Sequence, residues 1–320
     1  MMRFRHFPCH LLCLTLLTGS LTAQAQETPP AGDAAQPTAP EQRAPLSERS
    51  DLEALALERQ LATGEQQQLD AAGSRFLALW RPANDAEPKG LVILLPDDDE
   101  SADGPQGVGP LRRKLPDVGW HSLSLSLPDP QGALLPVRQA ETPAAEKPAA
   151  EQTAPGEPAQ PTAPTEQPSA ASDSERAAHV QRIFARIDAG IAFAGQQQAR
   201  HIVLLGHGSG AYWAARYIAE RTPGNVNDLL LVDTRQPEGF STPVNELMPQ
   251  LKARIGDFYY RDSAAARQAA LLRKQVSQRS KNAPFVQVGL DALPGNPEVA
   301  AEQLLRRLRG WLDKEVAGEK

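Results

Sequence analysis

The apolar run Leu91–Leu95 (LVILL) constrains the fold of this chain more than any other stretch. A strand in which every residue is apolar offers neither face to water, so it belongs in a sheet that is covered on both sides. Parallel strands connected through helices build such a sheet. The rest of the chain should therefore alternate between strands and helices.

That alternation is present from Arg49 onward. We predict strands from apolar runs or period-two alternation at Ser74–Trp80, Leu91–Leu95, His121–Leu127, Ile202–Leu205, Leu229–Asp233, Arg254–Tyr260 and Phe285–Leu290. Apolar side chains at helical spacing predict helices at Arg49–Gln60, around Val180–Ile191, at Gly210–Glu220, at Ala264–Val276 and from Val299 to Leu312. The fold class predicted is α/β: a single domain with a mostly parallel sheet, helices on both faces, and ligand sites at the carboxyl ends of the strands.

The first residues have the pattern of a secretory signal peptide. Arg3 and Arg5 precede an apolar stretch, Leu11–Leu21, and the small-residue pattern Ala23–Ala25 follows it. The stretch is about half of the roughly 20 residues that a membrane helix needs. We therefore predict a signal peptide over 1–25, a mature chain that starts near Gln26 without a transmembrane segment, and a periplasmic or secreted location.

Composition excludes some classes of function. The two cysteines, Cys9 and Cys13, lie in the predicted signal peptide, so the mature chain has no disulfide and relies on a packed core. The formal net charge is −6, and a mildly acidic chain without clustered Lys and Arg has no electrostatic basis for binding nucleic acid. We expect no cofactor, and partners that are a small ligand or an envelope protein.

Two segments rich in Pro, Ala, Glu, Thr and Gln contain too few large apolar residues to form a core: Glu27–Pro45 and Glu141–Asp173. We predict that both are disordered. The expected organisation is a linker over 26–46, a domain over 47–316 with a disordered insertion over 141–173, and a tail over 317–320.

The stretch LLGHGSGA lies between a predicted strand and a predicted helix, where an α/β-hydrolase presents its nucleophile in a G-x-S-x-G turn. Gly206 and Gly210 fit the flanking positions of that motif, which leaves Gly208 at its centre. Centring the motif on Ser209 would put the imidazole of His207 where a small residue is needed. We expect Gly208 to keep the turn without a nucleophile, and the hydroxyl of Ser209 to cap the helix.

The base of a serine triad is also missing. In this fold the histidine follows the nucleophile and the acid along the chain, yet no histidine follows Ser209. Asp262 stands where the acid is expected, although a surface ion pair with Arg261 or a helix cap is the simpler role for it. His207 lies within the turn itself, where packing or hydrogen bonding is expected of it.

The loop after Leu91–Leu95 begins with Pro96, which has no N–H to donate to an oxyanion, and its carboxylates would oppose one. Within it Asp99, Ser101 and Asp103 have the alternate spacing of a calcium loop, but the closing glutamate is absent. We expect a solvated acidic loop without a metal, and keep a weak calcium site as the alternative.

Four segments, Gly90–Leu95, Pro110–Pro116, Gly119–Pro128 and Gly206–Glu220, resemble an uncharacterised bacterial family of the α/β-hydrolase superfamily. The resemblance runs from about Glu48 to Glu315 and implies the fold, without naming a reaction. The chain departs from the family's pattern at Pro96-Asp97, where a His-Gly-like pair is usual.

These observations support an exported protein of α/β-hydrolase fold that binds a ligand or an envelope partner without catalysis, with Gly208, Ser209 and Gly210 as the candidate ligand-binding residues. A helix amino terminus there would attract an anion. The alternative is a serine hydrolase of carboxylic esters or peptide bonds that uses Ser209, with Asp262 as acid and His207 as a possible base.

Overall fold

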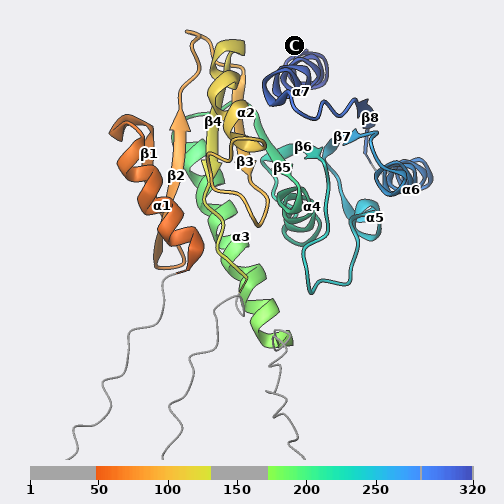
Figure 1. Ribbon diagram of the computed structural model, residues 1–320, viewed down its shortest axis with the longest axis horizontal. Helices are drawn as coiled ribbons and strands as arrows, with labels where there is room; N and C mark the ends of the chain where they lie inside the picture. Colours follow the sequence, from red (N-terminus) through yellow and green to blue (C-terminus); the bar gives the residue numbers. More distant parts are fainter. Residues whose placement is uncertain (1–47, 131–171, 282, 319–320) are drawn as a thin grey trace, which may run out of the picture. The chain divides into compact units, whose positions relative to one another are not determined.

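Eight strands form one sheet in the order β1-β2-β4-β3-β5-β6-β7-β8 in the computed structural model (Figure 1). The structure describes residues 48–130, 172–281 and 283–318. The predicted signal peptide, the linker and residues 141–171 of the predicted insertion lie outside the described residues. Ser172 caps helix α3, which begins at Asp173, so the insertion ends before the predicted boundary at residue 173.

The strands are mostly parallel, as predicted. Their bounds are β1 Gln66–Ala71, β2 Ser74–Arg81, β3 Gly90–Leu95, β4 Trp120–Leu125, β5 Ile202–His207, β6 Val226–Val232, β7 Arg254–Tyr260 and β8 Phe285–Leu290. Strands β4, β3, β5, β6, β7 and β8 pair in parallel, whereas β2 is antiparallel to both of its neighbours. The carboxyl ends of the parallel strands therefore meet at one edge of the sheet, where a ligand site is expected.

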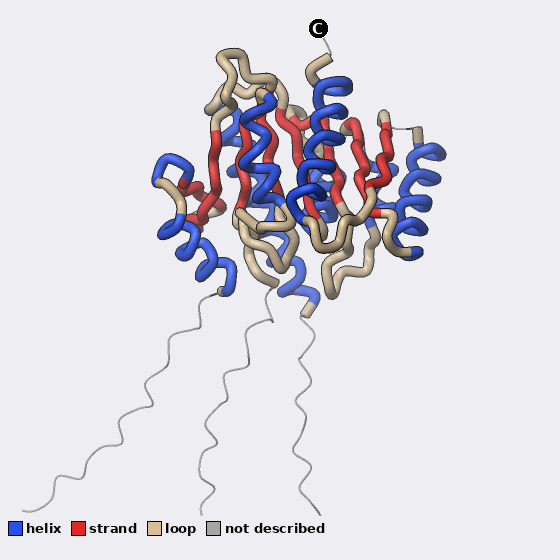
Figure 2. The backbone as a smooth tube through the Cα atoms, turned by 45° about the horizontal axis from the view of Figure 1, so that its top comes forward, coloured by secondary structure: helices blue, strands red, loops and turns tan. Residues whose placement is uncertain are grey.

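Helices cover both faces of this sheet (Figure 2). The α-helices are α1 Arg49–Gln60, α2 Val108–Lys114, α3 Asp173–Gln196, α4 Ser209–Arg221, α5 Val244–Leu247, α6 Ala264–Ser280 and α7 Pro297–Trp311. Short helical segments are η1 Thr63–Glu65, η2 Leu115–Val118, η3 Met248–Gln250 and η4 Leu312–Val316. In Figure 1, α2 and α7 lie on one side of the strands, and α3, α4 and α5 on the other.

Strand β3 shows why this sequence forms a sheet that is covered by helices on both faces. Leu91, Ile93 and Leu95 belong to the apolar cluster under α3 and α4, while Val92 and Leu94 belong to the cluster under α2 and α7. All of them are fully buried. The apolar run therefore supplies both cores at once, and the predicted α/β fold is confirmed.

Three of the strands and α-helices were not predicted: β1, α2 and the four-residue α5. Strand β1 (QQQLDA) has one large apolar residue, Leu69, because it pairs only with β2 at the edge of the sheet. Helix α2 contains Pro110 and ends in three basic residues, which hides its apolar side in the sequence. In the described part of the chain, no helix has the length and apolarity to cross a membrane.

A histidine is buried within the aromatic part of the core. His179 on α3 is 3% exposed, and its ring lies edge-on to Trp213 at a centroid distance of 5.5 Å, with Phe240 also in contact. Burial lowers the pKa of His179 to about 4, and the charge of Arg182 adds to this effect. The native state therefore keeps this imidazole neutral down to a pH at which an unfolded chain has already protonated it.

We expect this histidine to weaken the fold in mild acid. A native pKa below the unfolded value means that stability is full above about pH 6.5 and is lost as the pH falls toward 4. The loss between pH 7.5 and pH 5 should be about 2 kcal/mol. Urea unfolding of the wild type and of His179→Leu at both pH values measures it. An equal pH dependence in the two proteins would contradict this account.

Candidate functional site

The turn from β5 to α4 has the geometry of a nucleophile elbow centred on a glycine. Gly208 has φ 60° and ψ −123°, a backbone conformation that side chains disfavour. A Cβ on Gly206 would lie 2.2 Å from the carbonyl oxygen of Gly210, and a Cβ on Gly210 would lie 2.2 Å from that of Leu95. Both flanking positions therefore require glycine, and the central residue of the motif is Gly208.

A carboxylate fills the space in which a nucleophile would stand. A Cβ on Gly208 would lie 2.4 Å from Cγ of Asp97 and 2.5 Å from its Oδ2. Asp97 comes from the loop that follows β3, and it is 6% exposed. The loop that donates to the oxyanion in active hydrolases here inserts an anion into the elbow.

Three groups hold the Asp97 carboxylate. The Ser209 N–H donates to Oδ1 over 2.9 Å, the Asp98 N–H donates to the same oxygen over 3.0 Å, and Arg235 forms an ion pair with Oδ2. Burial raises the pKa of Asp97, but the hydrogen bonds from Ser209 and the charge of Arg235 outweigh it, so the pKa lies below its usual range. The anion expected at this helix amino terminus is thus supplied by the chain itself.

Ser209 does not cap the helix, so that expectation is wrong. The cap position of α4 is Gly208, without a side-chain hydrogen bond, and the Ser209 Oγ instead accepts the Asp98 N–H over 2.7 Å. The Trp213 Nε1–H donates to the Asp98 carboxylate over 3.1 Å. Burial raises the pKa of Asp98 above its usual value, although hydrogen bonds from Trp213 and Ser209 offset part of the rise. Ser209 is 3% exposed and fastens the loop to α4.

No hydrogen bond among the described residues joins His207 to Ser209. The His207 Nδ1 lies 3.1 Å from Oε2 of Glu100, and the imidazole is buried, as expected for a packed, hydrogen-bonded histidine. Asp233, which follows β6, was given no role from the sequence. Burial raises the pKa of Asp233 above its usual value, and the charges of His207 and Arg235 offset only part of that rise. The proximity of His207, Glu100 and Asp233 was not predicted, because these residues come from different strands and loops.

Asp262 has neither of the roles expected for it. Arg261 pairs with Asp291 over 2.6 Å rather than with Asp262, and the cap of α6 is Ser263, whose Oγ accepts the Ala266 N–H over 3.0 Å. Asp262 is exposed after β7, and within the described residues no hydrogen bond or ion pair engages its carboxylate. Among the described residues, no histidine forms a hydrogen bond with Asp262.

The weak calcium pattern does not form a ligand cluster. Asp103 accepts the Arg112 Nε–H over 3.0 Å and an N–H of Arg113 over 2.6 Å, which engages its carboxylate in ion pairs. In residues 48–130, 172–281 and 283–318, no group of three or more His, Cys, Asp or Glu side chains is placed to hold a metal ion. Asp99 and Ser101 thus lack their expected third ligand.

Comparisons with solved structures agree on the fold. A Klebsiella pneumoniae protein of proposed dienelactone hydrolase activity matches with a TM-score of 0.51 at 15% identity, over 78% of this chain and 97% of its own. Est1E from Butyrivibrio proteoclasticus matches with 0.50 at 11%, over 78% and 99%. The Pyrococcus furiosus esterase PF2001 matches with 0.50 at 11%, over 79% and 91%. At these identities the likeness shows the α/β-hydrolase fold alone.

Comparisons of sequence give the family. Among curated proteins, none matches this chain. The profile of DUF3530, described as a protein of unknown function, matches residues 7–314 and thus nearly the whole chain. The resemblance to an uncharacterised family with a hydrolase fold is confirmed by this match together with the solved structures. The chain belongs to the DUF3530 family.

Proposed function

We propose that this chain is an exported, non-catalytic protein of the α/β-hydrolase fold, which acts by binding a small ligand or an envelope protein. The observation that supports the proposal best is the Asp97 carboxylate, which occupies the nucleophile's space at Gly208. Export rests on the signal-peptide pattern over 1–25. Cell fractionation should find the chain in the periplasm, cleaved near Ala25; an uncleaved cytoplasmic chain would refute export.

The electrostatics of the elbow oppose acyl transfer. A serine protease or esterase stabilises the developing oxyanion with backbone N–H groups, one of them from the residue after the nucleophile. Here that residue is Ser209, and its N–H already donates to the Asp97 carboxylate. A substrate oxyanion would have to displace this carboxylate and overcome the charge of Asp98 beside it. The site therefore disfavours the negative charge that develops on the oxyanion during acyl transfer.

The alternative, a hydrolase that uses Ser209, lacks the chemical partners it needs. A serine hydroxyl attacks when a base removes its proton. His207 lies against Glu100, and no histidine follows it in the sequence. The Ser209 Oγ is itself buried and accepts a hydrogen bond from the Asp98 N–H. The geometry thus favours a structural role for Ser209.

Ester turnover tests the proposal. We expect the purified protein to hydrolyse p-nitrophenyl acetate and p-nitrophenyl butyrate no faster than Ser209→Ala does at the same concentration. The variant is the control because surface lysines and histidines also react slowly with such esters. Turnover that saturates with substrate and disappears in Ser209→Ala would establish the hydrolase and refute the non-catalytic function.

A further inference from the structure

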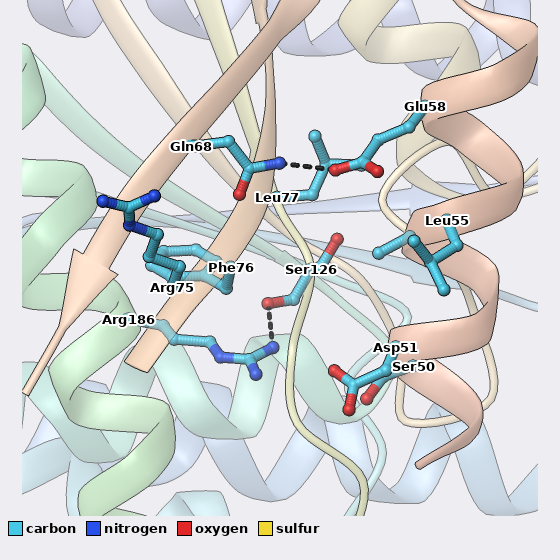
Figure 3. A pocket seen from close by; sticks show the side chains of 11 residues that line it. Ser50, Asp51, Leu55, Glu58, Gln68, Arg75, Phe76, Leu77, Ser126 and Arg186 are labelled. Atoms are coloured by element: carbon cyan, nitrogen blue, oxygen red, sulfur yellow. Dashed lines mark hydrogen bonds between the residues drawn. The ribbon is translucent and has the colours of Figure 1, made fainter. Parts of the chain in front are cut away.

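A second candidate site lies away from the elbow. A cavity of about 230 Å³ opens between α1 and the β1–β2 edge of the sheet, with α3 beside it (Figure 3). None of the residues that line it belongs to the β5–α4 turn. Ligand sites commonly measure about 300 to 1,000 Å³. This cavity therefore has room for a small molecule only.

One part of the cavity wall is apolar. Phe76 and Leu77 of β2 are 5% and 2% exposed, and Leu55 of α1 faces them while remaining 52% exposed. Figure 3 shows Leu55 and Phe76 on opposite sides of the space. A large apolar side chain that is half in water lowers the free energy of the complex when a ligand covers it. The wall therefore suits an aliphatic or aromatic group.

The other part carries a buried cation. Arg186 of α3 is 9% exposed, and its guanidinium carbon lies 5.0 Å from the centroid of the Phe76 ring. Its Nη1–H donates to the Ser126 carbonyl over 2.7 Å. A guanidinium has five N–H donors, and no carboxylate in the described residues forms an ion pair with this one. Donors remain that can bind a carboxylate in the cavity.

An unpaired anion lines the same cavity. Asp51 of α1 is exposed, and among the described residues no hydrogen bond or ion pair engages its carboxylate. Figure 3 shows Asp51 on α1, across the space from Arg186. Of the acidic residues near Arg186, Asp51 exerts the largest electrostatic effect on it, and yet the two do not touch. Opposite charges therefore face the cavity with a gap between them.

We propose that this cavity binds an α-amino acid with an apolar side chain. The ligand carboxylate accepts hydrogen bonds from Arg186, its ammonium group donates to Asp51, and its side chain packs against Leu55 and Phe76. In an amino acid of this class the ammonium and carboxylate groups are attached to the same carbon atom, which suits the gap between Asp51 and Arg186. Arg75 also lines the cavity as an exposed cation, and the carboxylate of Glu58 there already accepts a hydrogen bond from the Gln68 amide. The proposal rests on the proposed function in taking the chain to act by binding.

Titration calorimetry with three probes tests the site. L-leucine carries both charges, L-leucinamide lacks the carboxylate, and N-acetyl-L-leucine lacks the ammonium group. We expect L-leucine to bind and each analogue to bind about tenfold more weakly or worse, as the loss of one charged hydrogen bond implies. If L-leucine gave no binding heat at concentrations up to about 1 mM, the proposal would be overturned.

Variants assign the two ends of the ligand. Asp51→Asn, an exposed change that leaves the core intact, should weaken L-leucine about tenfold and leave N-acetyl-L-leucine unchanged. Glu53→Gln, on the same helix but outside the cavity lining, should change neither. Arg186→Lys should weaken L-leucine and N-acetyl-L-leucine alike. Unchanged L-leucine affinity in Asp51→Asn would overturn the site, whereas ester turnover at the elbow would refute the proposed function and not this cavity.

Discussion

Replacing Arg273 with methionine should lower the free energy of unfolding by about 3 to 5 kcal/mol. Arg273 of α6 binds the carboxylate of Asp257 on β7 with two hydrogen bonds, Nε to Oδ2 over 2.9 Å and Nη2 to Oδ1 over 3.0 Å. Asp257 is 0% exposed and Arg273 5%. Methionine fills much of the same space, so the main loss is the partner of a buried charge. The Gln287 amide, at 2.8 Å, remains as its described side-chain donor.

Urea unfolding at pH 7.5 measures this loss, with an exposed ion pair as the control. Arg261 pairs with Asp291, and their side chains are 50% and 65% exposed. Arg261→Met should therefore cost less than about 1 kcal/mol. Adding Asp257→Leu to Arg273→Met should recover part of the loss, because no buried carboxylate is then left unpaired. Equal small losses in Arg273→Met and Arg261→Met would show that the buried ion pair stabilises the fold no more than the exposed one does.

Gly208→Ala should be the second most damaging change, at about 2 to 3 kcal/mol. Part of the cost is backbone strain, because φ at this residue is 60°. The rest is steric, because the added Cβ would lie 2.4 Å from Cγ of Asp97. That carboxylate cannot simply turn aside, since the Ser209 N–H and Arg235 hold it. Thermal or urea unfolding measures the effect.

A double-mutant cycle separates the two contributions. Asp97→Gly clears the space beside Gly208, so the alanine should cost about 1 kcal/mol less in that background. Gly195→Ala is the matched control, because a Cβ there meets nothing within 4 Å, and its effect should stay within about 0.5 kcal/mol. Strict additivity of Gly208→Ala and Asp97→Gly would show that the carboxylate does not occupy this space.

Much of the site was predictable from local sequence. The spacing of Gly206, Gly208 and Gly210 predicts an elbow without a side chain at its centre, since close backbone approach forbids anything larger at the flanks. The absence of a later histidine is likewise a matter of counting along the chain. Such features can be predicted because they depend on residues that are close together in the sequence or on their order along it.

The rest depended on contacts between distant residues. Asp97 is 112 residues from Ser209 along the chain, and only the fold brings the two together. In the sequence Asp97 stood out only as part of the Pro96-Asp97 pair that departs from the family's pattern, and nothing there placed its carboxylate against Gly208. The cap expected of Ser209 was wrong for the same reason, because the hydroxyl binds the N–H of Asp98 from the loop after β3.

The fold divides in a similar way. Helix α1 matches its predicted bounds, Arg49–Gln60, because helical periodicity is a local signal. Strand β1 and helix α2 were missed because one is an edge strand with little to bury and the other is short and contains Pro110. Both elements depend on tertiary packing, which the periodicity of apolar residues in the sequence does not reveal.

Intact-mass spectrometry after incubation with a fluorophosphonate tests most directly whether the elbow is without a nucleophile. The account predicts an unchanged mass for the wild-type protein, because Gly208 has no side chain and the Ser209 Oγ is buried against the Asp98 N–H. A serine esterase labelled in parallel shows that the reagent is active. One phosphonyl adduct per chain that is lost in Ser209→Ala would contradict the account.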